Sequence, residues 1–273
     1  MPHLLTMAML VAALTLPLQA EVYHSSHLGW KAGQDVTELF SSLLVNGKLE
    51  AGNELVLDHT YMISGTHELP DTFTLSAKQG AGFEVTDAEK DKNSKAFLIL
   101  GHDNALRNVT ITYLNTPQPG PTGEKPGKTF TRKLGILASG KRDLLFENCR
   151  FVGSINQHVN LTDKCARPRF IECHVVGGHW AFNISVEDAV FRRCVFEKCQ
   201  GYGIKTQWAK RVLIEQCVFQ DNGRVAVDTT GGYDNSVVRN TIFRRNRGSG
   251  VDIMSLYNSE ADMESPENHG ILI

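Results

Sequence analysis

Apolar and polar positions recur along the second half of the chain with a period of 21 to 24 residues. Each copy starts and ends with an apolar residue and carries cysteine or asparagine at its fourth position; the copies lie at residues 146–151, 170–175, 191–196, 214–219 and 237–242. Short stretches of alternating polarity, separated by Gly, Asn or Asp, predict strands, and no ten-residue helical period lies between them. Parallel strands joined without a helix require a chain that coils around its own sheets. The pattern therefore predicts an all-β fold, a single-stranded right-handed parallel β-helix.

Four of the six cysteines share one phase of this repeat. The fourth residues of the first four copies are Cys149, Cys173, Cys194 and Cys217. We expect them to stack inside the coils about 4.8 Å apart, the spacing of paired strands. A buried free cysteine packs like a small apolar residue, whereas a metal or redox cluster would need His or Asp in the same phase, and neither is present there. Cys165 and Cys199 lie off this ladder, and an oxidising compartment would allow one disulfide.

The N-terminal part predicts a capping helix followed by the first strands. Residues 35–38 have the spacing of a capping box. One apolar helical face follows from Val36, Leu39, Phe40, Leu43 and Leu44. Such a helix would close the open end of the first coil, and strand-like segments follow at 54–57, 60–64 and 73–76.

These patterns divide one solenoid domain into three stretches. Residues 1–20 are a predicted signal peptide, 21–95 the N-terminal cap and first strands, and 96–273 the β-helix. The last residues, 269–273, look like the beginning of another strand. Either a coil packs in an unusual way there, or the sequence is a truncated copy of a longer protein.

Composition adds two points: it argues against nucleic acid as a partner, and it indicates export from the cytoplasm. The 273 residues carry 28 Lys+Arg against 30 Asp+Glu, a net charge of -2, which argues against a nucleic-acid binder. An apolar run from Leu4 to Leu18, followed by a small-residue cleavage site at Ala20, indicates a secretory signal. Because no later segment is long and apolar enough to span a bilayer, we expect a secreted or periplasmic monomer without a membrane segment in its mature form.

The Phe-x-x-Cys-x-Phe and Ile-x-x-Cys-x-Phe copies, with Gln-Gly and Asn-Gly turns before the next strand, resemble the pectate-lyase-like β-helix superfamily. The resemblance covers residues 95–273, about seven coils. It implies the fold and a carbohydrate-active class of protein. It does not select one activity, because many activities share this coil.

One column of polar residues recurs once per coil, between apolar neighbours. Its members are Asn160, Asn183, Lys205, Asp228 and Asp252. The alternation predicts that they point outward on one sheet. A second outward column follows at Thr162, Ser185, Gln207 and Thr230, with His158 on the other side. As an ordinary solvated face, this strip would hold a cross-strand ion pair between Lys205 and Asp228, worth at most about 1 kcal/mol.

Two chemistries fit this strip. A polysaccharide lyase would use Lys205 as the base, with His158 as a second candidate, while Asp228 and Asp252 hold a Ca²⁺ that neutralises a uronate carboxylate. A glycoside hydrolase would use Asp228 and Asp252 as an acid pair. The motifs of polygalacturonase-type hydrolases and of mannuronan epimerases are missing, so the lyase ranks first.

The expected ligand is an acidic polysaccharide or oligosaccharide. Candidate contacts to its sugars are Asn160, Asn183, Gln207, Trp208 and Thr230. Trp208, three residues after Lys205, is the best-placed aromatic platform, and Trp180 is another. A loop at 117–133 with four positive charges could attract the anionic chain. A non-catalytic polysaccharide-binding or surface-structural β-helix is the competing hypothesis.

Overall fold

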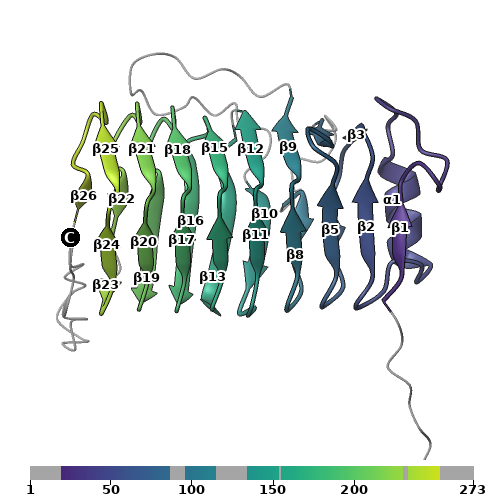
Figure 1. Cartoon of the computed structure of the whole chain (residues 1–273), viewed down its shortest axis with the longest axis horizontal. Helices are drawn as coiled ribbons and strands as arrows, with labels where there is room; N and C mark the ends of the chain where they lie inside the picture. Colours follow the sequence, from purple (N-terminus) through teal and green to yellow (C-terminus); the bar gives the residue numbers. More distant parts are fainter. Residues whose placement is uncertain (1–19, 87–95, 115–133, 154, 230–232, 253–273) are drawn as a thin grey trace, which may run out of the picture.

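The computed structural model describes residues 20–86, 96–114, 134–153, 155–229 and 233–252. Three parallel sheets wrap around one core, and the chain passes through them in turn. Successive coils stack along the long axis of the molecule, with the single described helix at the N-terminal end (Figure 1). This arrangement is the predicted parallel β-helix with its capping helix.

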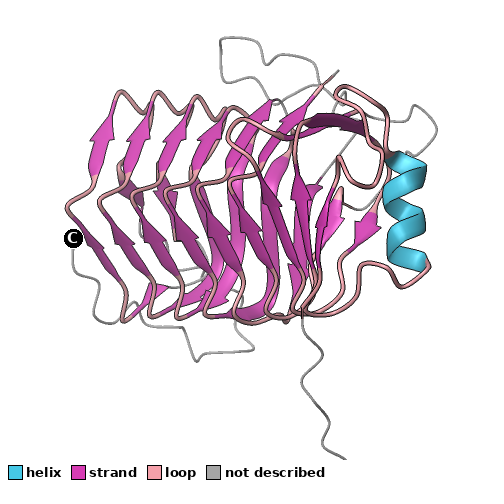
Figure 2. Cartoon of the chain, turned by 45° about the vertical axis from the view of Figure 1, so that its right-hand side comes forward, coloured by secondary structure: helices cyan, strands magenta, loops and turns pink. Residues whose placement is uncertain are grey.

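The coils contribute strands to the three sheets in turn, and the paired strands are parallel. Sheet A contains β1 (Val22–His24), β2 (Glu54–Leu57), β5 (Thr74–Ala77), β8 (Ala105–Arg107), β11 (Leu145–Glu147), β14 (Arg169–Ile171), β17 (Val190–Arg192), β20 (Leu213–Glu215) and β24 (Val237–Arg239). Sheet B contains β3 (Thr60–Ile63), β6 (Gly82–Val85), β9 (Thr110–Tyr113), β12 (Arg150–Gly153), β15 (His174–Val176), β18 (Val195–Glu197), β21 (Val218–Gln220) and β25 (Ile242–Arg244). Sheet C contains β4 (His67–Glu68), β7 (Leu98–Ile99), β10 (Leu134–Ser139), β13 (Gln157–Ala166), β16 (Trp180–Glu187), β19 (Ile204–Lys210), β22 (Val227–Asp228) and β26 (Val251–Asp252), with β23 (Tyr233–Asp234) beside β19. Figure 2 shows the three strand directions within each coil.

The core consists of side chains that repeat from coil to coil. Phe146, Phe170 and Phe191 stack with ring centroids 4.6 and 4.7 Å apart and nearly parallel planes. Phe196 and Phe219 repeat this arrangement at 4.7 Å. The stacking follows from the repeat, because equivalent positions in paired parallel strands lie about 4.8 Å apart. Burial of these rings is a main source of stability for the coil.

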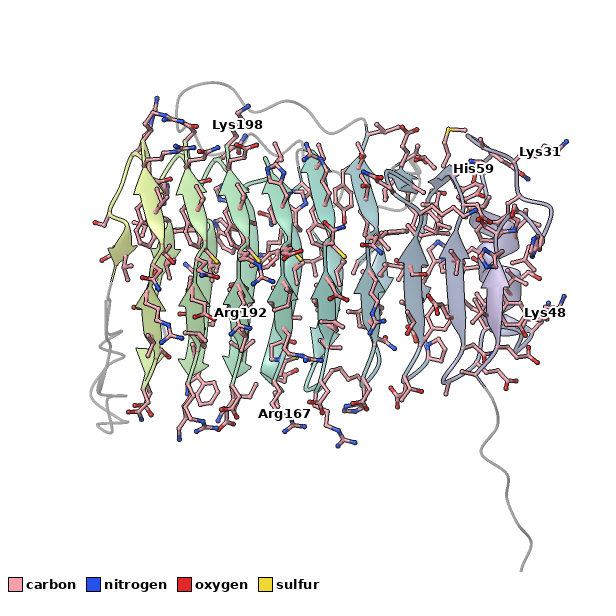
Figure 3. All side chains as sticks on the ribbon, in the orientation of Figure 1. Lys31, Lys48, His59, Arg167, Arg192 and Lys198 are labelled. Carbon is pink, nitrogen blue, oxygen red and sulfur yellow. The ribbon has the colours of Figure 1, made fainter. Side chains whose placement is uncertain are left out.

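The cysteine ladder lies beside these rings, and all six cysteines are buried free thiols. Each ladder thiol donates a hydrogen bond to a backbone carbonyl of the preceding coil: Cys149 to Leu106, Cys173 to Phe146, Cys194 to Phe170 and Cys217 to Phe191, at 3.2 to 3.6 Å. Figure 3 shows sulfur atoms (yellow) in a row across successive coils. The ladder is therefore packing, as predicted, while the disulfide considered for Cys165 and Cys199 is not formed.

The capping helix, α1 (Thr37–Val45), begins differently from the prediction. The predicted capping box is wrong: Val36 is the N-cap residue, and no side chain caps the helix. Asp35 accepts hydrogen bonds from the backbone nitrogen and the hydroxyl of Thr37, at 3.0 and 2.7 Å. Asp35 also forms a parallel β-bridge with Met62 of the first coil, which holds it in a strand conformation outside the helix.

The apolar face of α1 is narrower than predicted. Phe40 is fully buried, and Leu43 and Leu44 pack against the core. Leu39 is 41% exposed and points away from the first coil. The helix therefore closes the N-terminal end mainly with one aromatic ring, which contacts Phe83 at 5.8 Å.

Several expectations concern residues outside the described ranges. They are the signal peptide over residues 1–19, the basic loop at 117–133, Thr230 and the C-terminal strand at 269–273. Among the described residues, no helix has the length and apolar character needed to cross a membrane.

Candidate functional site

The predicted polar column is formed by the register of sheet C. Asn160 pairs with Asn183, Asn183 with Lys205, Lys205 with Asp228, and Asp228 with Asp252. The column therefore runs across five adjacent strands, from β13 to β26. Its placement follows from the apolar neighbours on each side, which face the core.

The middle of this column is more enclosed than the alternation predicts. Asn183 is 4% exposed and Asp228 is 2% exposed. The Asn183 amide donates a hydrogen bond to Asn160 Oδ1 at 3.4 Å. Short side chains in adjacent strands shield one another, because their Cα atoms lie only about 4.8 Å apart. Asn183 and Asp228 are thus enclosed polar groups, whereas Asn160, Lys205 and Asp252 are partly exposed.

Lys205 is held by one carboxylate and two aromatic rings. Its Nζ lies 3.7 Å from Asp228 Oδ2, which confirms the cross-strand ion pair. The same nitrogen lies 5.1 Å from the ring centroid of Trp180 and 5.1 Å from that of Tyr202, within reach of cation–π attraction. The Lys205 side chain is 20% exposed. These contacts hold the Lys205 ammonium in place, so it is suited to bind an anion.

The second predicted column is wrong, because two strands carry extra residues. Ile184 pairs with Thr206, but Ser185 pairs with Trp208, which leaves Gln207 as a bulged residue in β19. A register shift in β13 likewise separates Thr162 from Ser185. Alternation of polar residues cannot reveal such an insertion.

The bulge also moves the predicted aromatic platform away from Lys205. The ring of Trp208 lies beneath Lys164 Nζ, 4.7 Å from the ring centroid. Trp180 occupies the position beside Lys205 that Trp208 was expected to take. Gln207 is exposed and Trp208 half-buried, farther along the strand from the enclosed polar groups.

His158 is a core residue, which corrects its assignment as a second base. It is fully buried and packs against Tyr113 and Phe151, with ring centroids 5.5 and 6.3 Å apart. Its Nε2 donates to the Gly177 carbonyl at 3.2 Å. Burial lowers the pKa of His158 to about 4, so the ring is neutral. Gly178 makes room for it, since a Cβ there would lie 2.8 Å from the imidazole.

Three residues that the sequence did not single out lie in the turns that lead from sheet B into sheet C, near Lys205. They are His179, Tyr202 and Arg224. The ring of His179 stacks on Trp180, with centroids 5.3 Å apart and planes 28° apart. Tyr202 lies 6.1 Å from Trp180 in the next coil, and the Arg224 guanidinium lies 5.9 Å from the Tyr202 ring.

The electrostatics of these turns set the charge of His179. Burial lowers the pKa of His179, and the positive charges of Arg224 and Lys205 lower it further. A neutral imidazole therefore stands beside two cations.

Glycines in the same turns are a feature of the sequence that indicates this close packing of side chains against the next coil. A Cβ at Gly201 would lie 2.9 Å from Trp180 Cδ1, so the indole lies against the bare backbone of the next coil. Gly178 and Gly223 occupy neighbouring turns of the same phase. Recurrent glycines indicate close approach of a side chain, although they do not say which one.

Buried polar atoms without a hydrogen-bond partner gather here. They include His179 Nδ1, Trp180 Nε1, Asn183 Oδ1 and Gln200 Oε1. Buried polar groups are nearly always paired in native proteins, so such a concentration marks a place where bound water would complete the bonding. We call His179, Trp180, Asn183, Gln200, Tyr202, Lys205, Arg224 and Asp228 the Lys205 cluster.

The residues of the cluster do not fit a calcium ion. Ca²⁺ takes six to eight oxygen ligands. The described residues contain no group of three or more His, Cys, Asp or Glu side chains placed to hold a metal. The carboxylate of Asp228 is 3% exposed and already faces the Lys205 ammonium. The cation beside Asp228 is therefore supplied by the chain itself.

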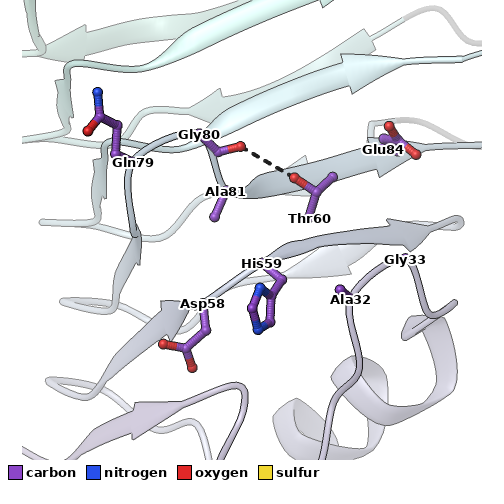
Figure 4. A pocket seen from close by; sticks show the side chains of 9 residues that line it. All are labelled: Ala32, Gly33, Asp58, His59, Thr60, Gln79, Gly80, Ala81 and Glu84. Atoms are coloured by element: carbon purple, nitrogen blue, oxygen red, sulfur yellow. Dashed lines mark hydrogen bonds between the residues drawn. The ribbon is translucent and has the colours of Figure 1, made fainter.

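A cavity of about 390 Å³ lies elsewhere, at the N-terminal coils. It opens between the loop at Ala32 and Gly33 and the strands β3 and β6, with the His59 ring directed into it (Figure 4). Thr60 at its wall donates to the Gly80 carbonyl at 3.4 Å. None of its lining residues belongs to the Lys205 cluster.

Comparison with known proteins agrees with this architecture. The sequence model described as "right handed beta helix region" matches residues 75–272. The chain belongs to this right-handed β-helix family. Comparison with curated proteins gives no match.

Two solved structures show a distant similarity to this chain. The ORF18 protein of Geobacillus virus E2 is 12% identical, with a TM-score of 0.40, over 86% of this chain and 62% of that one. A candidate glycosyl hydrolase from Parabacteroides merdae ATCC 43184 is 14% identical, with a TM-score of 0.33, over 83% of this chain and 97% of that one. The chain thus spans less than two thirds of the length of the viral protein.

Proposed function

We propose that this β-helix protein is an exported polysaccharide lyase that cleaves a uronate-containing chain by β-elimination at the Lys205 cluster. The observation that carries the proposal is the Lys205 ammonium, held between Trp180 and Tyr202 and surrounded by enclosed polar atoms that lack partners. Cations, aromatic rings and free hydrogen-bonding groups are the three kinds of contact that an acidic sugar uses.

Recognition of the sugar rests on complementary groups in adjacent coils. The rings of Trp180 and Tyr202 offer apolar surface to the C–H groups of a sugar, and both carry a polar handle. Gln200 is partly exposed, so its side-chain amide can bond to hydroxyl groups. Lys205 and Arg224 provide two positive charges for the carboxylate.

Elimination at a uronate requires stabilisation of the charge that develops on the carboxylate when the C5 proton is removed. Lys205 fits this task, because Asp228 and the two rings hold its ammonium in place before substrate binds. In this proposal Lys205 has an electrostatic role in place of that of the base. Asp228 orients this cation and is a positioning residue.

The structure argues against a hydrolase built on Asp228 and Asp252. The two residues are paired in adjacent strands, as that hypothesis requires. However, the Asp228 side chain is 3% exposed and ion-paired with Lys205. A carboxylate so enclosed cannot reach a sugar as a nucleophile.

The proposal is tested by incubating the protein with pectate, alginate and glycosaminoglycan and following the ultraviolet absorbance of unsaturated uronate ends. We expect a signal on at least one of them. Replacing Lys205 alone would leave the Asp228 charge buried, so the informative variant combines Lys205→Met with Asp228→Asn. We expect this variant to lose about 100-fold in kcat/KM, the usual effect of removing one stabilising group.

Lys210→Met provides the matched control, because Lys210 lies on the same strand outside the cluster. It should retain the activity of the natural sequence. Binding of all three polymers without any unsaturated product would overturn the lyase and support a binding protein.

A further inference from the structure

Resting on the proposed lyase function, we propose that His179 is the proton acceptor of the elimination, the group that removes the C5 proton of the uronate. His179 lies in the turn before β16, and its ring is stacked on Trp180, the same indole that faces Lys205 Nζ. The imidazole and the ammonium therefore flank one aromatic surface. A uronate seated there has a cation for its carboxylate and a ring nitrogen for its proton.

The two candidate bases that the sequence singled out are occupied or closed. Lys205 is ion-paired with Asp228. His158 is fully buried between Tyr113 and Phe151. His179, unlike His158, is partly exposed, and because its ring nitrogen Nδ1 is buried, Nε2 is the nitrogen open to a substrate.

The surroundings of His179 keep its ring neutral. Lys205 and Arg224 are the charged groups that act on it, and Asp228 is directed at Lys205. Burial is the larger cause of its lowered pKa, and the two cations add to it. An unprotonated imidazole is the form that accepts a proton at neutral pH.

The step balances without any further reactant except water. The imidazole takes the proton from C5, and the electron pair of that C–H bond forms the C4=C5 double bond. The C4–O4 bond breaks, and its electron pair stays on O4, which takes a proton from water. The imidazolium then returns its proton to the hydroxide so formed. Nothing is oxidised or reduced.

Two variants distinguish the role of His179 as a proton acceptor from its role as a ring stacked on Trp180. His179→Phe keeps an aromatic ring on Trp180 but has no proton acceptor. We expect its kcat to fall by at least about 100-fold, as for loss of a general base, while KM changes by only a few fold. In the variant His179→Ala, added imidazole should restore part of kcat by occupying the space beside Trp180.

The pH profile gives a second readout. In the natural sequence, kcat should fall on the acid side of pH 6.5, the ordinary histidine value, because the pKa of His179 is lowered. His179→Phe should lack this acid limb. A His179→Phe variant with natural kcat, or no rescue of His179→Ala by imidazole, overturns the assignment while leaving the lyase intact. A natural protein that forms no unsaturated ends contradicts the lyase and the role of His179 together.

Discussion

His158 makes the core sensitive to mild acid. Its pKa is about 4 in the folded protein against 6.5 for an ordinary histidine, because the ring is fully buried. Between these two values the unfolded chain binds a proton that the folded chain does not, so stability rises with pH across this window. A difference of 2.5 pKa units corresponds to about 3 kcal/mol, which is present above pH 6.5 and lost as the pH falls to 4.

His158→Phe should remove this dependence. The phenyl ring can occupy the same space between Tyr113 and Phe151, although the hydrogen bond to Gly177 is lost. We expect urea unfolding to show that the free energy of unfolding falls by about 3 kcal/mol less for the variant than for the natural sequence between pH 7 and pH 4. Equal slopes for the two proteins would show that His158 takes up its proton without unfolding.

The turn residues that precede the ladder cysteines have positive φ angles. The residue before each ladder cysteine adopts φ between 51° and 55°, and this position is Asn148 in one coil and Gln216 in another. A left-handed conformation costs about 1–2 kcal/mol for most residues and less for asparagine, whose side chain can bond locally.

Gln216→Asn should therefore stabilise the protein by about 0.5 to 1 kcal/mol. Gln216 is exposed, so few contacts are lost by the change. The midpoint of urea unfolding measures the gain, and Gln216→Ala is the control that should give none. Loss of stability in the asparagine variant would mean that the turn is not strained.

At the scale of elements, the sequence predicted what repeats and missed what interrupts the repeat. Apolar alternation placed β2 at its observed bounds and aligned Asn183, Lys205 and Asp228 in adjacent strands. It could not show the bulge at Gln207, because one inserted residue leaves the composition of a strand unchanged. It also could not show that His179 in a turn reaches the same surface, since the recurrent glycines of the turns do not say which side chain lies against them.

The cysteine ladder makes a prediction about reactivity. Burial raises the pKa of Cys173, and hydrogen bonding to the preceding cysteine of the ladder raises the pKa values of Cys194 and Cys217. Burial raises the pKa of Cys199 to about 12. Since the thiolate is the reactive form, none of the six thiols should react with a thiol reagent in the folded protein.

All six should react after unfolding in denaturant without a reductant, because none is in a disulfide. A colorimetric thiol count before and after unfolding measures both states. Rapid labelling of a ladder cysteine in the folded protein would contradict the packed interior described here.

At the scale of the whole molecule, each coil contacts only its neighbours, so the ends are stabilised locally. At the N-terminal end, Asp58 holds the segment after β1 against the first coils. It accepts hydrogen bonds from the Ser26 backbone and hydroxyl at 2.9 and 2.6 Å, and Lys78 Nζ lies 2.6 Å away. Burial opposes its ionisation, but the bonds from Lys78, Ser26 and His24 outweigh it and hold the pKa of Asp58 well below its ordinary value.

Asp58→Asn should loosen this end alone. A lowered carboxyl pKa stabilises the fold above pH 3.8 and the contribution is lost as the pH falls below that value. At neutral pH we expect faster amide hydrogen exchange in β1 and β2, with a local cost of about 2 kcal/mol. Amides of β20 and β24 serve as the internal control and should not change. Uniform acceleration along the whole chain would contradict the independence of the coils.

The proposed reaction of the Lys205 cluster is cleavage of an acidic polysaccharide by elimination. Elimination consumes no water in forming its products, whereas hydrolysis places one water oxygen in a product for each bond cut. The most direct test is to digest a uronate polymer in water labelled with heavy oxygen and to weigh the fragments by mass spectrometry. Elimination at the Lys205 cluster would give fragments with an unsaturated end and no heavy oxygen. Saturated fragments that carry heavy oxygen, or an undigested polymer, would contradict it.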